Sequence, residues 1–376
     1  MKKTHLFTPG PTMVPPECLL EMSRPIIHHR TAEYRKMFSA VRENLKYVFR
    51  TENEVLCLSS SGTGAMEASV VNLLSAGDKI IVVRGGKFGE RFEEIAAAYG
   101  VETVALDVEW GKAANPEDIK KLLAPDIKAV YATLCETSTG TASDIKEIAR
   151  VTGESGACLV VDAISGLGCM ELETDRWGVD VVVSGSQKGL MIPPGLGFIS
   201  LDEKAWKMAG ESSLPKYYFD LAKAKKAQLD SDSAFTPPIS LIAGLNLALG
   251  MLRDEGIENT IARHSLMAEA VRAAVSALGL ELFSESPADS VTAVRVPAGI
   301  DGESFVKDFR KMGVYMAGGQ GRLKGKIFRL AHMGYMNELD VLQMLSAVEL
   351  GLASAGYEFA AGSGAGAAEK VFAGKR

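Results

Sequence analysis

Apolar, β-branched runs alternate with helical segments between residues 54 and 186, and this alternation limits the possible folds more than any other feature. The apolar runs are "EVLCLSS", "KIIVVRG", "ETVALDV", "AVYATLC", "CLVVDAI" and "DVVVSGS". The helical patterns between them include "GAMEASVVNLL", "ERFEEIAAAYG", "NPEDIKKLL" and "SDIKEIARVTGES". Nearly continuous apolar strands separated by helices are typical of a parallel sheet that is covered on both faces. The sequence therefore predicts an α/β fold with a mostly parallel, mixed sheet, in which active sites lie beyond the carboxyl ends of the strands.

The character of the sequence changes along the chain, which is long enough for two domains. The Pro- and Gly-rich start, with "TPGPTMVPP", predicts an extended N-terminal arm over 1–20. We assign 21–258 to a large domain. A long helical stretch, about 239–278, then leads into a smaller α+β domain over 259–356 with the strand-like runs "VTAVRV" and "IFRLA". The Ala/Gly-rich end predicts a flexible tail over 357–376.

Composition argues against several classes of function. Lys and Arg number 41 and Asp and Glu number 47, giving a net charge of −6, and no basic block appears, so nucleic-acid binding has little electrostatic support. No apolar run approaches the ~20 residues of a membrane span, and no signal peptide is indicated. The 5 cysteines lack C-x-x-C spacing, which favours reduced thiols over disulfides or a metal site. We therefore expect a cytoplasmic protein without a bound metal.

The stretch "LSSSGTGAME" joins the end of a predicted strand to the start of a helix. Free backbone N–H groups and the positive end of the helix dipole make such a junction a binding site for anions. Ser61 and Thr63 add hydroxyl groups, and Gly62 allows a ligand to approach the backbone closely. An ordinary helix N-cap is the alternative interpretation. We call Ser61, Gly62 and Thr63 the phosphate seat.

Two charged residues follow neighbouring predicted strands. Asp162 comes directly after "ACLVV", where its carboxylate could face a ligand or cap the next turn. Lys188 lies in "SGSQKGLMIPPG", between two apolar runs and with no acidic neighbour in sequence. Lysine is usually solvated, but a desolvated lysine has a lowered pKa, and its neutral amine attacks carbonyl groups.

An anion seat, a carboxylate and a nucleophilic lysine match the phosphate, the ring nitrogen and the aldehyde of pyridoxal phosphate. Phe88, in "VVRGGKFGER", could stack on a flat ring or belong to the core. Arg329, in "KGKIFRLAHMG", could bind a substrate carboxylate with its planar guanidinium, or lie on the surface of an edge strand.

In combination, these motifs resemble those of the class V aminotransferases, which are fold-type I pyridoxal-phosphate enzymes, and most closely the serine–pyruvate / alanine–glyoxylate group. The matching stretches are "TPGPTMVPP", "SSGTGAMEA", "GGKFGER", "ETSTG", "VVDAISGLG", "SGSQKGL", "FTPPISL" and "GGQGRLKGKIFRLAHMG". They extend from residue 6 to about residue 335 and so cover nearly the whole chain.

The resemblance implies a role for each residue of the cofactor site. Lys188 would hold pyridoxal phosphate covalently and act as the general base. Asp162 would pair with the protonated ring nitrogen, and Phe88 would stack on the ring where several relatives have tryptophan. Thr137, in "ETSTG", would contact the side of the ring that carries the hydroxyl group. Gln187 would assist the phosphate seat.

The resemblance also implies roles in substrate binding and assembly. Arg329 would bind the α-carboxylate of the substrate, with the Gly10 loop nearby. Thr236, in "FTPP", would reach the phosphate in a neighbouring subunit, which implies a homodimer with active sites at the subunit interface. The expected partners are otherwise small amino acids and 2-oxo acids.

The implied activity is the transfer of an amino group from alanine or serine to glyoxylate or pyruvate by a ping-pong mechanism. One alternative is a 2-aminoethylphosphonate–pyruvate transaminase. The other is a non-catalytic accessory subunit that keeps the fold, since some relatives have been labelled as hydrogenase-associated subunits. Phosphoserine aminotransferases share the Gln-Lys pair but fit the Arg329 motif less well. A cysteine desulfurase is disfavoured because Gln187 precedes Lys188 and because no cysteine follows Cys169.

Overall fold

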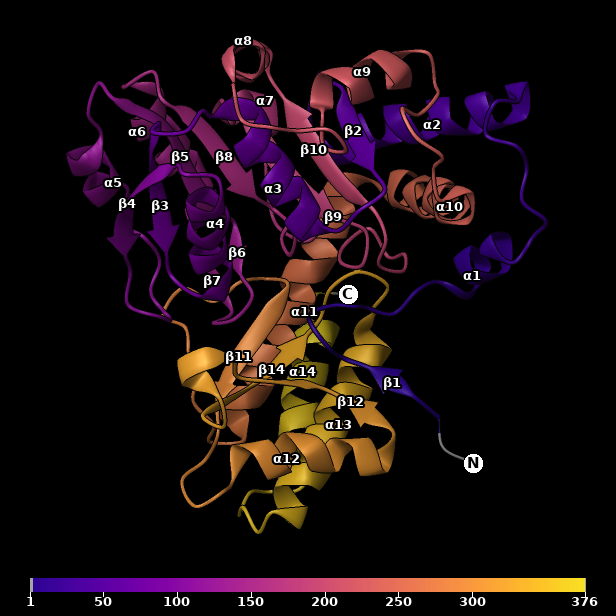
Figure 1. The fold of residues 1–376 in the computed structure, drawn as a ribbon. Coiled ribbons are helices and arrows are strands. Elements are labelled where there is room, and N and C mark those ends of the chain that lie inside the picture. The colour runs from indigo at the N-terminus through magenta and orange to yellow at the C-terminus, as the bar shows by residue number, and fades with distance from the viewer. Residues whose placement is uncertain (1–2, 376) are drawn as a thin grey trace.

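The computed structural model describes residues 3–375 and has a seven-stranded sheet at its centre (Figure 1). The strands follow the order β2-β10-β9-β8-β5-β3-β4. Their bounds are β2 Val55–Leu58, β3 Lys79–Arg84, β4 Glu102–Asp107, β5 Ile127–Thr133, β8 Cys158–Asp162, β9 Val181–Gly185 and β10 Gly197–Leu201. Strand β10 runs antiparallel to both of its neighbours, and the other neighbouring strands that pair are parallel. The prediction of a mostly parallel, mixed sheet is confirmed.

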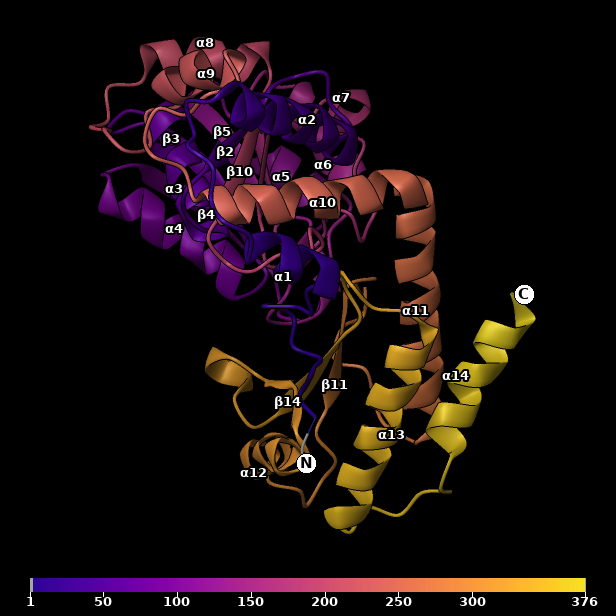
Figure 2. The same ribbon diagram turned by 90° about the vertical axis from the view of Figure 1, so that its right-hand side faces the viewer.

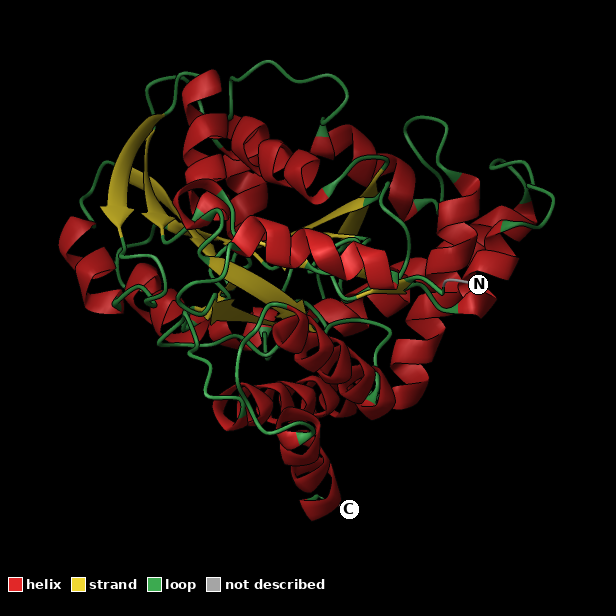
Figure 3. Cartoon of the chain, turned by 90° about the horizontal axis from the view of Figure 1, so that it is seen from below, coloured by secondary structure: helices red, strands yellow, loops and turns green. Residues whose placement is uncertain are grey.

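Helices cover both faces of this sheet (Figure 3). On one face lie α3 Gly62–Leu73, α4 Lys87–Ala98, α8 Glu203–Glu211 and α9 Leu221–Leu229. On the other lie α2 Ala32–Phe49, α5 Pro116–Leu122, α6 Ile145–Gly153 and α10 Ile239–Glu255. Successive strand residues point to opposite faces, so in β3 Ile80 and Val82 pack into one core and Ile81 and Val83 into the other. This two-sided burial explains why the strands are nearly continuous apolar runs.

A second group of elements packs below the sheet in Figure 1 around its own apolar core. A three-stranded antiparallel sheet has the order β11-β14-β13. Its strands are β11 Val291–Arg295, β13 Ala317–Gly318 and β14 Ile327–Ala331. The helices are α11 Ile257–Ala277, α12 Gly302–Phe309, α13 Glu338–Ser354 and α14 Ser363–Gly374. Two separate cores agree with a two-domain organisation, and the boundary at residue 258 stays a prediction.

The long helix expected over about 239–278 is in fact two helices. Helix α10 ends at Glu255 and α11 begins at Ile257, and the two axes turn sharply against each other (Figure 2). Gly256 between them has φ +86°, a conformation that residues with a side chain rarely adopt and that ends a helix. A continuous apolar pattern across this glycine concealed the break.

The N-terminal arm is more regular than its composition suggests. Strand β1, His5–Leu6, pairs in parallel with β12, Val314–Tyr315, in the smaller domain. Helix α1, Pro16–Met22, begins within the segment that was expected to be extended. Between these two elements, Thr12 contacts the chain just beyond β9: its backbone N–H donates to the carbonyl oxygen of Gln187 at 3.2 Å, and its hydroxyl donates to that of Lys188 at 3.1 Å. The arm thereby brings backbone groups to the place where a site is expected.

The expectation of a flexible tail is wrong for residues 363–374, which form helix α14 beside α11 and α13 (Figure 2). Phe372 is only 4% exposed and belongs to the core of the smaller domain. The carboxylate of Glu349 in α13 accepts the backbone N–H groups of Gly362, Gly364 and Ala365, at 2.7, 2.9 and 3.0 Å. Tertiary packing and a cap from another helix therefore stabilise a segment whose composition is typical of a loop.

Replacing Phe372 with Ala is expected to lower the free energy of unfolding by about 3 kcal/mol, because it leaves a cavity in a well-packed core. Urea denaturation of the two proteins measures the difference. The matched control is Glu369→Ala in the same helix, an exposed position at which the change should stay below about 0.5 kcal/mol. Equal effects of the two substitutions would show that α14 does not contribute to the core.

Strand β2 forms one edge of the large sheet, and a glutamine side chain covers its polar groups. The amide of Gln228, in α9, accepts the backbone N–H of Cys57 and donates to its carbonyl oxygen, both at 3.1 Å. The side chain thus replaces the hydrogen bonds of a missing neighbouring strand. It also fixes the end of α9, from which the chain enters the loop that carries Thr236.

Within residues 3–375, no helix combines the length and the apolar character needed to cross a membrane.

Candidate active site

Lys188 lies just beyond the carboxyl end of β9 and is 8% exposed. Its ammonium group donates to the carbonyl oxygen of Pro9 in the N-terminal arm. Gly10 approaches so closely that a Cβ atom there would collide with Nζ, which explains the need for glycine. Loss of water lowers the pKa of Lys188 to about 8, and the positive charge of Arg329 acts in the same direction. The sequence-based prediction of a sheltered amine at a strand end agrees with this placement.

Asp162 is the last residue of β8, the strand next to β9, and is 2% exposed. One of its carboxylate oxygens accepts the backbone N–H of Ile164 at 2.8 Å, so it also caps the turn as the alternative interpretation proposed. Burial raises its pKa to about 7, although the hydrogen bond from Ile164 and the charge of Lys188 oppose the rise. A positively charged group beside this carboxylate would restore its ionised form.

The phosphate seat forms the start of α3. Ser61 is the N-cap residue, and its hydroxyl oxygen accepts the backbone N–H of Gly64 at 3.3 Å. Gly62 lies against Ile164, whose Cδ1 would be 2.5 Å from a Cβ atom at that position. The interpretation as a helix N-cap is confirmed, and the use of the same helix start as an anion-binding site stays a prediction.

Phe88, in the first turn of α4, is half-buried, and a cation lies over its ring. The guanidinium carbon of Arg91 is 4.8 Å from the ring centroid, and its Nη1 donates to the hydroxyl oxygen of Thr63 at 3.1 Å. Arg91 thus connects the aromatic ring to the phosphate seat. Sequence reasoning missed this residue, although its spacing of three from Phe88 places both on one face of a helix.

Arg329 lies in β14, the central strand of the small sheet, and is 5% exposed. Its Nε and Nη2 donate to the carbonyl oxygen of Gly318 at 3.0 and 2.8 Å, and its Nη1 donates to that of Thr137 at 2.9 Å. Burial lowers its pKa to about 10, so the group remains a cation at neutral pH. The alternative of a surface arginine on an edge strand is therefore wrong. A buried cation held by carbonyl oxygens is suited to bind a carboxylate.

Thr137 and Gln187 complete the group at this edge. The hydroxyl of Thr137 donates to that of Ser165 at 2.6 Å, and both are buried. Gln187 has a buried side-chain oxygen without a hydrogen-bond partner among the described residues. Because an amide can turn to exchange its oxygen and nitrogen, this position can present an N–H group to an anion.

Glu136 is a further buried charge that the sequence analysis did not single out, although it begins the "ETSTG" motif. Burial raises its pKa, and hydrogen bonds from Ser138, Gly89 and Phe88 oppose the rise. Its negative charge acts on both Asp162 and Arg329.

Thr236 is exposed in the loop that joins α9 to α10. The predicted contact with a phosphate would be made in another subunit, so a single chain does not test it.

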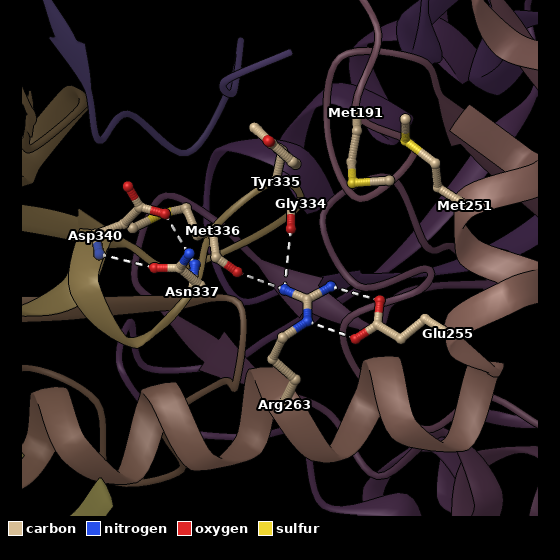
Figure 4. Close-up of a pocket in the computed structure, with 9 residues that line it drawn as sticks. All are labelled: Met191, Met251, Glu255, Arg263, Gly334, Tyr335, Met336, Asn337 and Asp340. Carbon is tan, nitrogen blue, oxygen red and sulfur yellow. Dashed lines mark hydrogen bonds and ion pairs between the residues drawn. The ribbon is translucent and has the colours of Figure 1, made fainter. Parts of the chain in front are cut away.

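A hollow of about 490 Å³ lies near the start of α13, and Figure 4 draws the residues that line it. It is lined by the Met191 and Met251 side chains and by the segment 334–337, and none of Lys188, Asp162 or Arg329 lines it. The guanidinium of Arg263 on its wall is fully engaged: it pairs with Glu255 and donates to two backbone carbonyl oxygens (Figure 4). The hollow therefore offers no free cation for a substrate carboxylate.

Comparisons with known proteins agree with this geometry. Residues 5–334 match the family model described as Aminotransferase class-V, and the chain belongs to that family. It is 36% identical to the serine–glyoxylate aminotransferase of Methylorubrum extorquens over 97% of this chain and 95% of that protein. It is 43% identical to a Synechococcus protein named "Soluble hydrogenase, small subunit", over 98% of both chains.

Among solved structures, the pyridoxamine–pyruvate aminotransferase of Mesorhizobium loti superposes with a TM-score of 0.95 at 28% identity, covering 100% of this chain and 98% of that one. The fold is that of the fold-type I pyridoxal-phosphate enzymes, and the protein is an aminotransferase. The resemblance seen in the motifs is confirmed.

Proposed function

We propose that this aminotransferase uses pyridoxal phosphate to move the amino group of alanine or serine to glyoxylate or pyruvate. The observation that carries the proposal is the desolvated amine of Lys188, gathered with a buried carboxylate and a buried guanidinium. The name of the Methylorubrum relative supports glyoxylate as the acceptor.

The residues present fit pyridoxal phosphate. Lys188 has the lowered pKa that a covalent bond to an aldehyde requires. Asp162 is a buried carboxylate in need of a cationic partner, as a protonated ring nitrogen would be. The phosphate seat and the Gln187 amide, whose oxygen has no partner among the described residues, suit the phosphate, while Phe88 and Thr137 suit the ring. When bound, the cofactor supplies an electron sink for the bond that breaks at the substrate Cα.

The chain's own residues would divide the remaining tasks. Arg329 binds the substrate α-carboxylate through a planar, charge-assisted pair and so fixes the orientation of the Cα–H bond. Lys188 removes the proton from Cα and returns it as the general acid, a role that suits a pKa near the working pH. Because amino donor and oxo acid use the same residues in turn, the kinetics should be ping-pong.

A donor panel tests the proposed activity. Purified protein with pyridoxal phosphate is assayed with alanine, serine, aspartate and 2-aminoethylphosphonate against glyoxylate and pyruvate. We expect turnover with alanine or serine plus glyoxylate. A strong preference for 2-aminoethylphosphonate would replace the proposal with the phosphonate alternative. No turnover, with a cofactor spectrum that no amino donor shifts, would favour the alternative of a non-catalytic accessory subunit; the Synechococcus relative is named as a hydrogenase subunit.

We also propose a homodimer in which the exposed Thr236 reaches the phosphate in the partner's site. Its exposure in the loop between α9 and α10 supports this arrangement. The five cysteines are free thiols among the described residues, which supports the proposed cytoplasmic location.

The rate of cofactor capture should depend on pH through the amine of Lys188. Only the neutral amine attacks an aldehyde, so the rate at which apo-protein binds pyridoxal phosphate should rise about tenfold between about pH 6 and 7 and level off above about pH 8. Ionisation of Asp162 near pH 7 acts in the same direction. Stopped-flow absorbance measures the rate. A rate that still increases steeply above about pH 9 would indicate a solvated lysine with an ordinary pKa.

A further inference from the structure

Helix α4 carries Phe88 but has no cap of its own. Its N-cap residue is Gly86, which has no side chain to accept the free N–H groups of the first turn. The first three of these groups belong to Lys87, Phe88 and Gly89. Without partners they would be costly to bury and would let the first turn fray.

The cap comes from a turn nearly fifty residues further along the chain. One carboxylate oxygen of Glu136 accepts the N–H of Phe88 at 3.0 Å and that of Gly89 at 3.1 Å. The hydroxyl oxygen of Ser138 accepts the N–H of Lys87 at 3.0 Å. All three donors are therefore satisfied by this turn.

Glu136 and Ser138 also bind each other. The second carboxylate oxygen of Glu136 accepts the Ser138 backbone N–H at 3.1 Å and its hydroxyl at 2.5 Å. Glu136 is 4% exposed, and a Cβ atom at Gly86 would collide with its side chain. A buried carboxylate with four donors is rigid, because every donor favours the same position.

The residue between them connects the same turn to substrate binding. The carbonyl oxygen of Thr137 accepts Nη1 of Arg329 at 2.9 Å, and its hydroxyl donates to Ser165, in the segment that follows Asp162. The turn 136–138 therefore contacts three parts of the site: helix α4, which carries Phe88; Arg329; and the segment after β8.

We propose that Glu136 is a positioning residue that fixes Phe88, and with it the cofactor ring, relative to Arg329. This inference rests on the proposed function. Glu136 acts through backbone groups. Its carboxylate accepts two N–H groups in the first turn of α4, and the next residue, Thr137, provides the carbonyl oxygen that accepts Nη1 of Arg329. The turn 136–138 thereby sets the distance between Phe88, where the cofactor ring would stack, and Arg329, where the substrate carboxylate would bind.

The test compares holo-proteins that carry Glu136→Gln or Asp180→Asn. Asp180 is a matched control, because it is a buried carboxylate that accepts the N–H of Leu159 at 2.6 Å and lies at the opposite, amino-terminal end of β9. In Glu136→Gln, an amide NH₂ must face two donors. We expect the Kd for pyridoxal phosphate to rise and kcat/KM for the amino donor to fall, each about tenfold, and the circular dichroism of the bound cofactor to weaken. Asp180→Asn should lower Tm alone.

A double-mutant cycle with Phe88→Leu identifies the route of the effect. If Glu136 acts through Phe88, Glu136→Gln should change the cofactor Kd by less than about threefold once Phe88 is replaced. Fully additive effects, or a Glu136→Gln protein that loses only Tm, would overturn the proposal. If Glu136→Gln does not fold, Ser138→Ala is measured in its place, because Ser138 caps Lys87 and binds Glu136. An unchanged Kd for the cofactor and an unchanged circular dichroism of the bound cofactor would then overturn the proposal. A wild-type protein that binds no cofactor would instead refute the proposed function.

Discussion

Lys188→Ala is expected to lower kcat for transamination by at least about 10⁴-fold, because one side chain serves as both the covalent anchor and the proton carrier. The fold should persist, since the substitution removes a desolvated amine whose hydrogen bond to the Pro9 carbonyl is offset by the cost of its burial. Steady-state kinetics measure the loss, and thermal denaturation should show a Tm within a few degrees of the wild-type value.

Lys216→Ala is the matched control for this substitution. Lys216 is a half-buried lysine whose pKa burial lowers, as it does for Lys188, and its ammonium group donates to the Val71 and Ser212 carbonyl oxygens at 3.2 and 3.3 Å. The hydrogen-bond partners of Lys216 include none of the candidate active-site residues, so its replacement should leave kcat unchanged. Transamination that persists at more than a trace in Lys188→Ala would remove Lys188 from its assigned role.

Arg329→Gln is expected to lower kcat/KM for the amino donor by about 10²- to 10³-fold, mainly through KM. The substitution removes the cation that would pair with the substrate carboxylate and leaves the Gly318 and Thr137 carbonyl oxygens with fewer donors. Arg329→Lys keeps the charge but loses the planar, two-pronged geometry, so an intermediate value is expected. Initial rates over a range of donor concentrations separate KM from kcat.

The control for Arg329 lies on the neighbouring strand. Arg295, at the end of β11, is exposed and pairs with Glu281 at 3.8 Å, so Arg295→Gln removes the same type of charge without touching the site. Its kcat/KM should equal that of the wild type. An Arg329→Gln protein that binds the donor as tightly as Arg295→Gln does would show that another group recognises the carboxylate.

Much of the fold could be predicted from the sequence, because the signals were local. Buried parallel strands require apolar runs, and each run in the large domain became a strand; all but the edge strand β4 have residues that face two cores. The helix at 363–374 could not be predicted, because its stability depends on contacts with distant segments. Gly364 packs on Leu278, and Glu349 caps the helix from α13. The Ala/Gly-rich composition of the segment does not indicate either of these contacts.

The candidate site likewise contains residues that a local pattern predicts and residues that it does not. Asp162 and Lys188 were found because strand ends converge at one edge of a parallel sheet, which a sequence pattern reveals. Glu136 and Arg91 were missed because they act on Phe88 and Thr63, at separations of 48 and 28 residues. Pro9 and Gly10 meet Lys188 across an even longer separation of about 179 residues. Such long-range contacts are set by the packing of whole elements, and the local spacing of Arg91 from Phe88 does not reveal them.

Borohydride reduction of the holo-protein tests the central claim most directly. If the sheltered amine of Lys188 binds the aldehyde of pyridoxal phosphate, reduction should fix the cofactor permanently to that side chain. Peptide mass spectrometry should then find the added mass on the peptide that contains Lys188, and on no peptide of the Lys188→Ala protein. A label on another lysine, or none on a protein that turns over, would contradict the assignment of this site.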